Sequence, residues 1–504
     1  MNIYVLNVII IALASLMALF AVRYAYFKIL KIAKDKDLVD NPDARKLQKI
    51  PVPVMGGIAV FIGVVAGLFA GIVLNSFFGQ SDLYPLMPIL LAMIIMLYTG
   101  AIDDIIGLTP RSRFIIEILT VLGIIYSSGS CIDSFHGLFG VNVFNWYVAV
   151  PLTVFAGVGI INAINMIDGV NGLSSGLCIT CCILYGCIFF SVGDITNSML
   201  AFIVAASLFP FLLHNVFGLR SRMFIGDAGT MVMGVLITWF TICIIRSDSI
   251  VALNQKFLNA NVIAVALAIF SVPVFDTLRV ITMRILKRMS PFHPDKTHLH
   301  HVFVNVGYSH SITALLEIGI NLIVFGTWLL AYFFEASINW QLYIVLISAM
   351  ILVWGTYFFL SNQIKHHTDT LHKLTYYSIS THLGHKNWWI WLQMLLDRRE
   401  IIDETSFEVK VKQPSNVIIF DSDLKTYKDQ DRKKILEFMK GKAEVYVEDI
   451  ERRSGAEKLR IFPILFEGEM QGYIKVITRS GLGTPEIVAL ADDVTFAQSP
   501  SSCP

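Results

Sequence analysis

Three groups of carboxylate and amide side chains stand in the short gaps between very apolar stretches of this sequence. They are the pair Asp103 and Asp104, the pair Asn165 and Asp168, and the single residue Asp227. A carboxylate inside a bilayer is energetically costly and usually marks a working site. Oxygen ligands of this kind suit a hard divalent cation, and a carboxylate can also act as a base. The first hypothesis is therefore a metal and phosphate site at a membrane surface.

The middle group belongs to the stretch NAINMIDGVNG, which has a polar side chain at every third position. These side chains are Asn162, Asn165, Asp168 and Asn171. A spacing of three places neighbouring members on one helical face, and the two glycines let the backbone turn closely around a ligand. The structural alternative is a helix C-terminus followed by an Asx turn. Four polar groups with two glycines exceed what a cap requires, so a binding role is favoured.

The acidic residues also have simpler explanations. Asp103 and Asp104 either bind a cation or form a solvated helix end. Asp227 stands where an apolar stretch begins, so a simple helix N-cap is the alternative explanation for it. Its case for a site depends on its being brought together with Asn165.

A histidine-rich stretch forms a fourth polar group. His293, His298, His300 and His301 fall within nine residues, and such a cluster suits a metal or a polyanion. Zinc binding and an ordinary loop are the alternatives. No cysteine stands nearby, and Lys296 and further basic residues accompany the histidines, so phosphate recognition is favoured.

Two cations precede the second apolar stretch. Arg45 and Lys46 can bind phosphate groups at the membrane surface. Cations also gather on the cytoplasmic side of membrane proteins for reasons of topology alone. Both explanations stay open.

The composition indicates which elements must position these residues. The chain has 504 residues, of which 55% are hydrophobic and 15% charged, against about 25% charged residues in soluble domains. Apolar stretches near 20 residues long are typical of transmembrane helices. We predict an all-α polytopic membrane protein with eleven spans, near 3–28, 53–78, 86–102, 113–130, 146–166, 173–192, 198–218, 224–245, 261–284, 311–334 and 340–361.

The distribution of Lys and Arg predicts the orientation of these spans. Residues 29–52 contain six of them, whereas loops such as 79–85 and 131–145 contain none. The positive-inside rule makes the basic loops cytoplasmic, which places the N-terminus outside and the C-terminus inside. All four polar groups then fall on the cytoplasmic face, although the basic loop 246–260 departs from the pattern.

We expect three regions along the chain. Residues 1–362 form the transmembrane domain, 363–402 a connecting segment, and 403–504 a small cytosolic α/β domain of unknown role. In the connecting segment, Trp388 and Trp391 lie close to basic residues. This mix suits an amphipathic helix at the headgroup level, and a plain linker helix is the alternative.

In this order, the polar stretches resemble those of the polyprenyl-phosphate N-acetylhexosamine-1-phosphate transferases of the WecA, TagO and MraY type, over residues 36–305. The resemblance implies transfer of a sugar 1-phosphate from a UDP-N-acetylhexosamine to undecaprenyl phosphate, with release of UMP. It also implies Mg²⁺, or Mn²⁺ in its place, the inner membrane of a bacterium, and the start of a lipid-linked cell-envelope glycan such as O-antigen. A homodimer is common in this family, and no nucleic acid is expected as a partner.

The resemblance also implies roles for individual residues. Asn165 and Asp227 match magnesium ligands, and Asp103, Asp104 and Asp168 match catalytic positions. Asn171 stands where many bacterial members have Asp. The residues expected to bind substrate are Arg45, Lys46, Asn162, Asn171, His298, His300 and His301.

The order His-Leu-His-His at residues 298–301 resembles the N-acetylglucosamine type more than the muramyl-pentapeptide type. A phospho-MurNAc-pentapeptide transferase is therefore the second choice. The lipid phosphate has a second pKa of about 6 and is largely ionised near neutrality, which favours its direct attack over a covalent aspartyl-phosphate. A secondary transporter is the alternative from another class, but transporters place such residues near the midplane.

Overall fold

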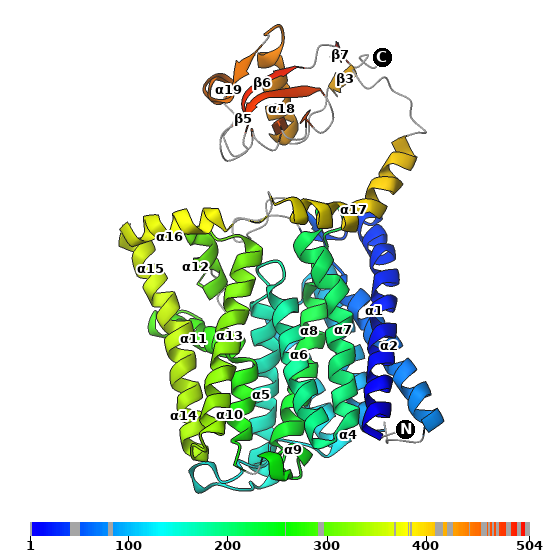
Figure 1. Cartoon of the computed structure of the whole chain (residues 1–504), viewed down its shortest axis with the longest axis vertical. Coiled ribbons are helices and arrows are strands. Elements are labelled where there is room, and N and C mark those ends of the chain that lie inside the picture. The colour runs from blue at the N-terminus through cyan, green and yellow to red at the C-terminus, as the bar shows by residue number, and fades with distance from the viewer. Residues whose placement is uncertain are drawn as a thin grey trace. The chain divides into compact units, whose positions relative to one another are not determined.

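The computed structural model of the protein is mostly helical and describes residues 3–40, 51–78, 84–257, 259–290, 297–366, 369–381, 383, 386–408, 417–420, 427–442, 444–454, 461, 464–465, 468–469, 473–479, 485–490 and 495–498. The chain forms two compact units, Met1–Ile401 and Ile402–Pro504. The first unit is a bundle of long helices (Figure 1).

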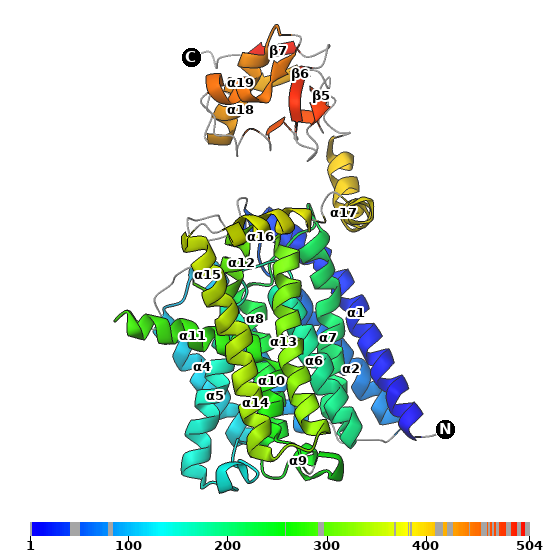
Figure 2. The same cartoon turned by 60° about the vertical axis from the view of Figure 1, so that its left-hand side comes forward.

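Nine helical stretches in the described residues are long and apolar enough to cross a membrane. They are α1 (Ile3–Asp35), α2 (Gly56–Phe78), α3 (Met87–Ile106), α5 (Trp146–Met166), α6 (Leu173–Val192), α7 (Ile195–Phe217), α8 (Gly226–Ile245) continued by α9 (Ile250–Leu253), α13 (His310–Phe333), and α14 (Ile338–Ala349) continued through a π-helical turn, Met350–Gly355, by α15 (Thr356–His366). A tenth span is possible if α10 (Val262–Ile269) and α11 (Ser271–Leu286), which meet at an angle of 81°, count as one. Figure 2 shows α11 projecting sideways from the bundle.

The prediction of a largely helical membrane protein is confirmed, but the count of eleven spans is not. The predicted span 113–130 corresponds to α4 (Pro110–Ser128), which is absent from the membrane-capable helices among the described residues. Its first turns carry Arg111, Arg113 and Glu117. Because these charges lower its apolar character, length alone does not make it a span.

The centre of the bundle is α8. Its apolar stretch is entirely enclosed by other helices, and α2, α3, α5 and α6 pack around it. The outer helices instead expose large apolar side chains such as Phe69 and Phe155. An apolar outer surface of this extent is stable in lipid and not in water.

Short elements connect the long helices. β1 (Val39–Asp40) pairs antiparallel with β2 (Val52–Pro53), which leads into α2. The others are the 3₁₀ turns Tyr84–Leu86, Leu138–Gly140 and Gln255–Phe257, and the helix α12 (Leu299–Val306). Two further helices, α16 (Asp369–Ser380) and α17 (Asn387–Glu408), follow α15.

The second unit contains both helices and strands. The elements are α18 (Tyr427–Met439), α19 (Val447–Ser454), β3 (Val417–Phe420), β4 (Val445–Tyr446), β5 (Ile474–Arg479), β6 (Pro485–Leu490) and β7 (Thr495–Gln498). An antiparallel sheet has the order β4-β6-β5, and β3 pairs parallel with β7. Buried residues such as Ile435, Ile450 and Val488 form the core of this unit. Its cytosolic location stays a prediction.

Candidate functional site

Polar residues from α3, α4, α5 and α8 meet at one end of the bundle. The amide nitrogen of Asn165 donates hydrogen bonds to Oδ1 of Asp227 and, at 2.7 Å, to Oγ1 of Thr230. A guanidinium nitrogen of Arg113 lies 3.8 Å from the same oxygen of Asp227. The predicted partners Asn165 and Asp227, 62 positions apart in the sequence, therefore share one site.

Asp104 holds the first residues of α8. Its Oδ1 accepts the backbone N–H of Asp227 at 2.9 Å, and its Oδ2 accepts that of Ala228 at 3.1 Å. A carboxylate here satisfies N–H groups that lack partners within the helix and opposes the positive end of the helix dipole. Gly226 has φ +71°, and a Cβ there would come within 2.5 Å of Oδ2 of Asp104. Only glycine fits at this position without displacing the carboxylate.

Arg113 links several of the acidic residues. It donates to Oδ2 of Asp103 at 3.3 Å and to Oε1 of Glu117 at 3.1 Å. Glu117 is buried, and its other oxygen accepts a hydrogen bond from the predicted site residue Asn162. The sequence did not single out Arg113 or Glu117. The available signal was an Arg and a Glu four residues apart on one helical face.

Asp168 lies in the turn between α5 and α6. Its carboxylate accepts a hydrogen bond from Oγ of Ser174. Although part of the residue is exposed, the protein around the carboxylate raises the pKa of Asp168 to about 6, and the Ser174 hydrogen bond opposes that rise. In the same turn, the backbone N–H of Asn171 donates to Nδ1 of His310 at 3.4 Å.

The described histidines of the fourth group pack against this turn. A Cβ on Gly169 would collide with Nε2 of His300, so the ring lies directly on the backbone. The ring of His300 stacks on that of His298, with centroids 5.7 Å apart, and lies 4.5 Å from that of His301. Burial and the neighbouring histidines hold the pKa of His300 well below its ordinary value, so this ring is neutral at physiological pH.

Two charged residues of α11 orient the histidine group. Oδ2 of Asp276 lies 2.8 Å from Nδ1 of His298, and Oδ1 accepts a hydrogen bond from Arg279 at 2.7 Å. Arg279 also donates to the carbonyl of Thr297, and its guanidinium carbon lies 3.4 Å from the centre of the Tyr357 ring. Sequence reasoning missed Asp276 and Arg279 because they lie inside a predicted span. Charged residues within such a span were the signal that could have identified them.

The predicted site residues therefore fall into two groups in the structure. Asp103, Asp104, Asn162, Asn165 and Asp227 are joined to one another directly or through Arg113 and Glu117. Asp168 and Asn171 lie in the turn that His300 contacts, beside His298 and His301. Arg45, Lys46, His293 and Lys296 lie outside the described residues.

Asn165 and Asp227 were expected to hold a metal ion. No three His, Cys, Asp or Glu side chains of the described residues form a metal-binding group. Magnesium, however, retains several waters and is often bound by one or two carboxylates together with substrate phosphates. The side chain of Asp227 is 33% exposed, so a ligand can reach it. One carboxylate beside one amide is a donor set that fits this ion once Asn165 turns its amide oxygen toward it, in place of the nitrogen that donates to Asp227.

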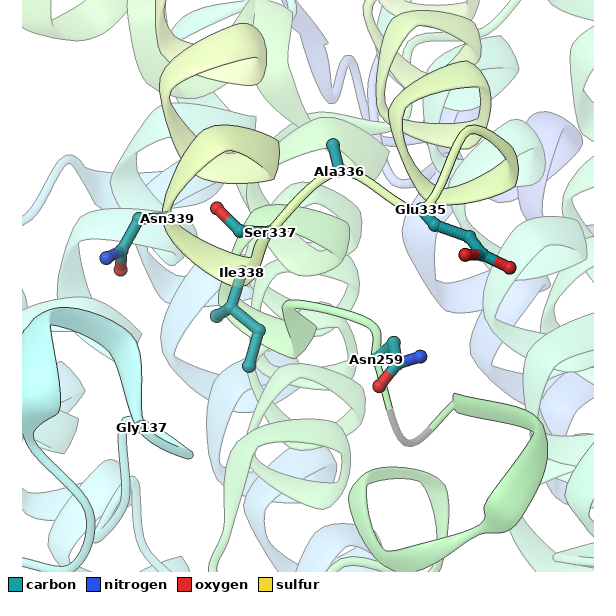
Figure 3. Close-up of a pocket in the computed structure, with 7 residues that line it drawn as sticks. All are labelled: Gly137, Asn259, Glu335, Ala336, Ser337, Ile338 and Asn339. Carbon is teal, nitrogen blue, oxygen red and sulfur yellow. The ribbon is translucent and has the colours of Figure 1, made fainter.

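One surface pocket lies elsewhere in the bundle. It is lined by Gly137, Asn259 and residues 335–339 (Figure 3). Residues 335–339 contain the turn from α13 to α14, at the opposite end of α13 from His310, which contacts the Asn171 turn. None of the predicted site residues lines this pocket, so it is separate from the site.

Comparison with known proteins matches this chain to one family over the region that contains these residues. The pattern of glycosyl transferase family 4 matches residues 86–245, a range that includes Asp103, Asn165 and Asp227. A protein of Bacillus subtilis named as a probable undecaprenyl-phosphate N-acetylglucosaminyl 1-phosphate transferase is 32% identical over 309 residues, which are 61% of this chain and 80% of the relative. The Yersinia pestis undecaprenyl-phosphate α-N-acetylglucosaminyl 1-phosphate transferase is 30% identical over 312 residues, covering 60% and 77%.

The Escherichia coli (strain K12) protein of that same name is 28% identical over 300 residues, which are 58% of this chain and 75% of the relative. The alignments thus cover at least three quarters of each of these relatives. The resemblance seen in the polar stretches is confirmed, and the chain belongs to glycosyl transferase family 4.

Proposed function

We propose that this protein transfers N-acetylglucosamine 1-phosphate, or the 1-phosphate of a related N-acetylhexosamine, from a UDP-sugar to undecaprenyl phosphate and releases UMP. The observation that carries the proposal is the meeting of Asn165, Asp227, Asp103 and Arg113 at one end of an apolar helix bundle. The names of the relatives support the same activity. Such a reaction needs a polar site at the level where a soluble nucleotide meets a membrane lipid.

The residues around Asp227 would hold the diphosphate of the donor. Asp104 fixes the backbone of Asp227, and Asn165 contacts its carboxylate. Asp227 and Asn165 would hold magnesium, or manganese in its place, and the ion when bound neutralises charge on the diphosphate. Arg113 adds a second positive charge beside the same carboxylate. Asp103 receives a hydrogen bond from Arg113 and would orient the lipid phosphate.

The acceptor needs little activation. A phosphate monoester with a second pKa of about 6 is already largely dianionic near neutral pH. One of its oxygens attacks the phosphorus that bears the sugar, the bond between the two phosphates of the donor breaks, and UMP leaves. Direct attack requires no covalent aspartyl-phosphate on Asp103, Asp104 or Asp168.

The histidine group would bind the donor. The carboxylate of Asp276 is hydrogen-bonded to Nδ1 of His298. The other ring nitrogen, Nε2, therefore points away from that carboxylate. His300 stays neutral beside Gly169 and can donate one hydrogen bond without adding charge. Asn171 and Asn162, with Arg45 and Lys46 outside the described residues, complete the predicted substrate contacts.

We place this reaction on the cytoplasmic side of a bacterial inner membrane, with the N-terminus outside and the C-terminus inside. The basic loops support that orientation. The product would start a lipid-linked glycan of the cell envelope, and a homodimer is the expected assembly.

One assay tests the proposal. Purified protein in lipid is incubated with undecaprenyl phosphate, Mg²⁺ and one UDP-sugar at a time, and UMP release is measured. The expected result is release with UDP-N-acetylglucosamine or a close analogue. Release only with UDP-MurNAc-pentapeptide would support the muramyl alternative. Release with none of them, together with cysteine labelling at positions 103 and 227 from the outer face, would favour transport.

A further inference from the structure

The first three turns of α17 are apolar on the side that faces away from the protein. Trp388, Trp391 and Leu395, spaced three and four residues apart, share one face of the helix. They are 51%, 61% and 49% exposed, whereas Leu396 and Asp397 on the other side are buried. A helix with apolar residues on its outward face needs a non-aqueous partner for that face.

The first three turns of α17 are called the segment below. The start of the segment contacts the end of a membrane-capable helix. Phe217 is the last residue of α7 (Ile195–Phe217). Its ring centroid lies 4.5 Å from that of Trp389 and 6.3 Å from that of Trp388. Because α7 has the length of a membrane span, its last residue marks the boundary between acyl chains and headgroups. Trp388 and Trp389 therefore lie at that boundary.

The end of the segment is fixed at the same level by Asp397. Its carboxylate accepts the backbone N–H groups of Leu219, Arg220 and Ser221 at 3.0, 3.1 and 3.0 Å, and the Ser221 hydroxyl at 2.6 Å. These residues immediately follow α7. From Trp389 to Asp397 the helix advances about 12 Å, and both ends meet the same short stretch of chain. The segment thus runs across the end of the bundle (Figure 1).

We propose that these three turns lie in the headgroup layer of the membrane, with Trp388, Trp391 and Leu395 directed toward the acyl chains. Tryptophan favours this layer because its ring is apolar and its N–H is polar. Lys386 and Arg398, at the two ends of the segment, are exposed and complement anionic headgroups. The sequence leaves a headgroup helix and a plain linker helix open, and the contacts with the end of α7 favour the former.

This placement has a consequence for the site. Asp397 holds the residues that lead from α7 to the start of α8, where Asp227 lies. The lipid contact of α17 and the geometry of that loop are therefore connected through one buried carboxylate. The placement does not depend on the proposed transferase reaction.

The test uses tryptophan fluorescence of the full chain in lipid nanodiscs that contain phosphatidylglycerol. The spectrum of the Trp391→Phe variant is subtracted from that of the wild type, which isolates the signal of Trp391. Lipids brominated near the headgroup end of the acyl chain should quench most of this difference signal, and aqueous iodide should quench little of it. Quenching by iodide without quenching by the brominated lipids would overturn the proposal, because Trp391 would then face water or a soluble partner.

Two controls bracket the measurement. Trp328 is buried in α13, so the Trp328→Phe difference signal should respond to neither quencher. Trp340 is exposed at the start of the membrane-capable α14, so its signal should respond to the brominated lipids. If Trp391→Phe loses its fold, Trp391→Tyr, which keeps a ring with a polar tip, replaces it under the same criteria.

Discussion

The carboxylate of Asp104 and the backbone N–H of Asp227 are joined by a hydrogen bond of 2.9 Å, although 123 positions separate the two residues. The second oxygen of Asp104 accepts the next N–H of α8. One side chain of α3 thereby determines where α8 begins and where the carboxylate of Asp227 lies. The neighbouring acids Asp103 and Asp104 thus have different partners, since Asp103 forms an ion pair with Arg113.

Replacement of Asp104 by alanine should lower both stability and activity. Two N–H groups at the start of α8 would lose their acceptor, and loss of a helix cap destabilises by about 0.5–2 kcal/mol. Asp104→Asn should retain part of this stability because the amide oxygen still accepts one hydrogen bond. Thermal unfolding in detergent and UMP release measure the two effects. Asp248→Ala, which removes an exposed carboxylate, is the control, and an effect of similar size there would contradict the anchoring role.

Removal of divalent metal should stop UMP release, and Mg²⁺ or Mn²⁺ should restore it. Asp227→Ala should abolish release at any metal concentration, and Asp227→Asn should require more Mg²⁺ because a neutral ligand holds a hard cation less well. Titration of Mg²⁺ into chelator-treated protein is the measurement. Glu335→Gln changes a carboxylate at the separate pocket and should leave the titration unchanged. Full activity of Asp227→Ala would remove Asp227 from the proposed site.

Asp276→Asn should disturb the histidine group. The buried guanidinium of Arg279 would lose its carboxylate, and breaking a buried ion pair costs about 3–5 kcal/mol. The amide would also hold His298 less firmly, so we expect a higher KM for the UDP-sugar and a lower Tm. His298→Gln separates the two effects, because it should raise KM while the pair of Asp276 and Arg279 stays intact. Unchanged kinetics in both variants would contradict a donor-binding role for His298.

The activity should fall as the pH drops through about 6. Asp168 has its pKa raised to about 6, so its carboxylate is ionised above that pH and neutral below it. Ser174 donates to the carboxylate and favours the ionised form, so Ser174→Ala should raise the pKa further and move the acid limb of the pH profile upward. Ser175→Ala, at a neighbouring buried hydroxyl without a hydrogen-bond partner among the described residues, should not move it.

The raised pKa of Asp168 should lower activity at acid pH but should increase the stability of the fold there. An aspartate with a raised pKa in the folded state favours folding when it is neutral. The contribution of Asp168 is therefore complete below its unfolded pKa of about 3.9 and is lost as the pH rises through about 6. Asp168→Asn should remove this pH dependence from the free energy of unfolding measured between those values. A dependence that persists in the variant would assign it to another group.

The sequence by itself determined the class of the protein and most of the residues near the site. Apolar length and the position of polar interruptions are local properties, so a helical membrane protein and the groups at Asp103, Asn165 and Asp227 are visible without a fold. The order of these groups along the chain was enough to indicate the family. Local composition could not settle the number of spans, because α4 combines the length of a span with charges at its start.

Only the tertiary structure decided what each side chain contacts. Arg113 joins Asp103 to Asp227, and Asp276 fixes His298, yet none of these pairs are neighbours in the sequence. A charge inside an apolar span looks unfavourable until its partner from another helix is known, because burial penalises an unpaired charge and tolerates a paired one. The role of Asp397 was also hidden, because its partners lie 176 to 178 positions earlier in the chain.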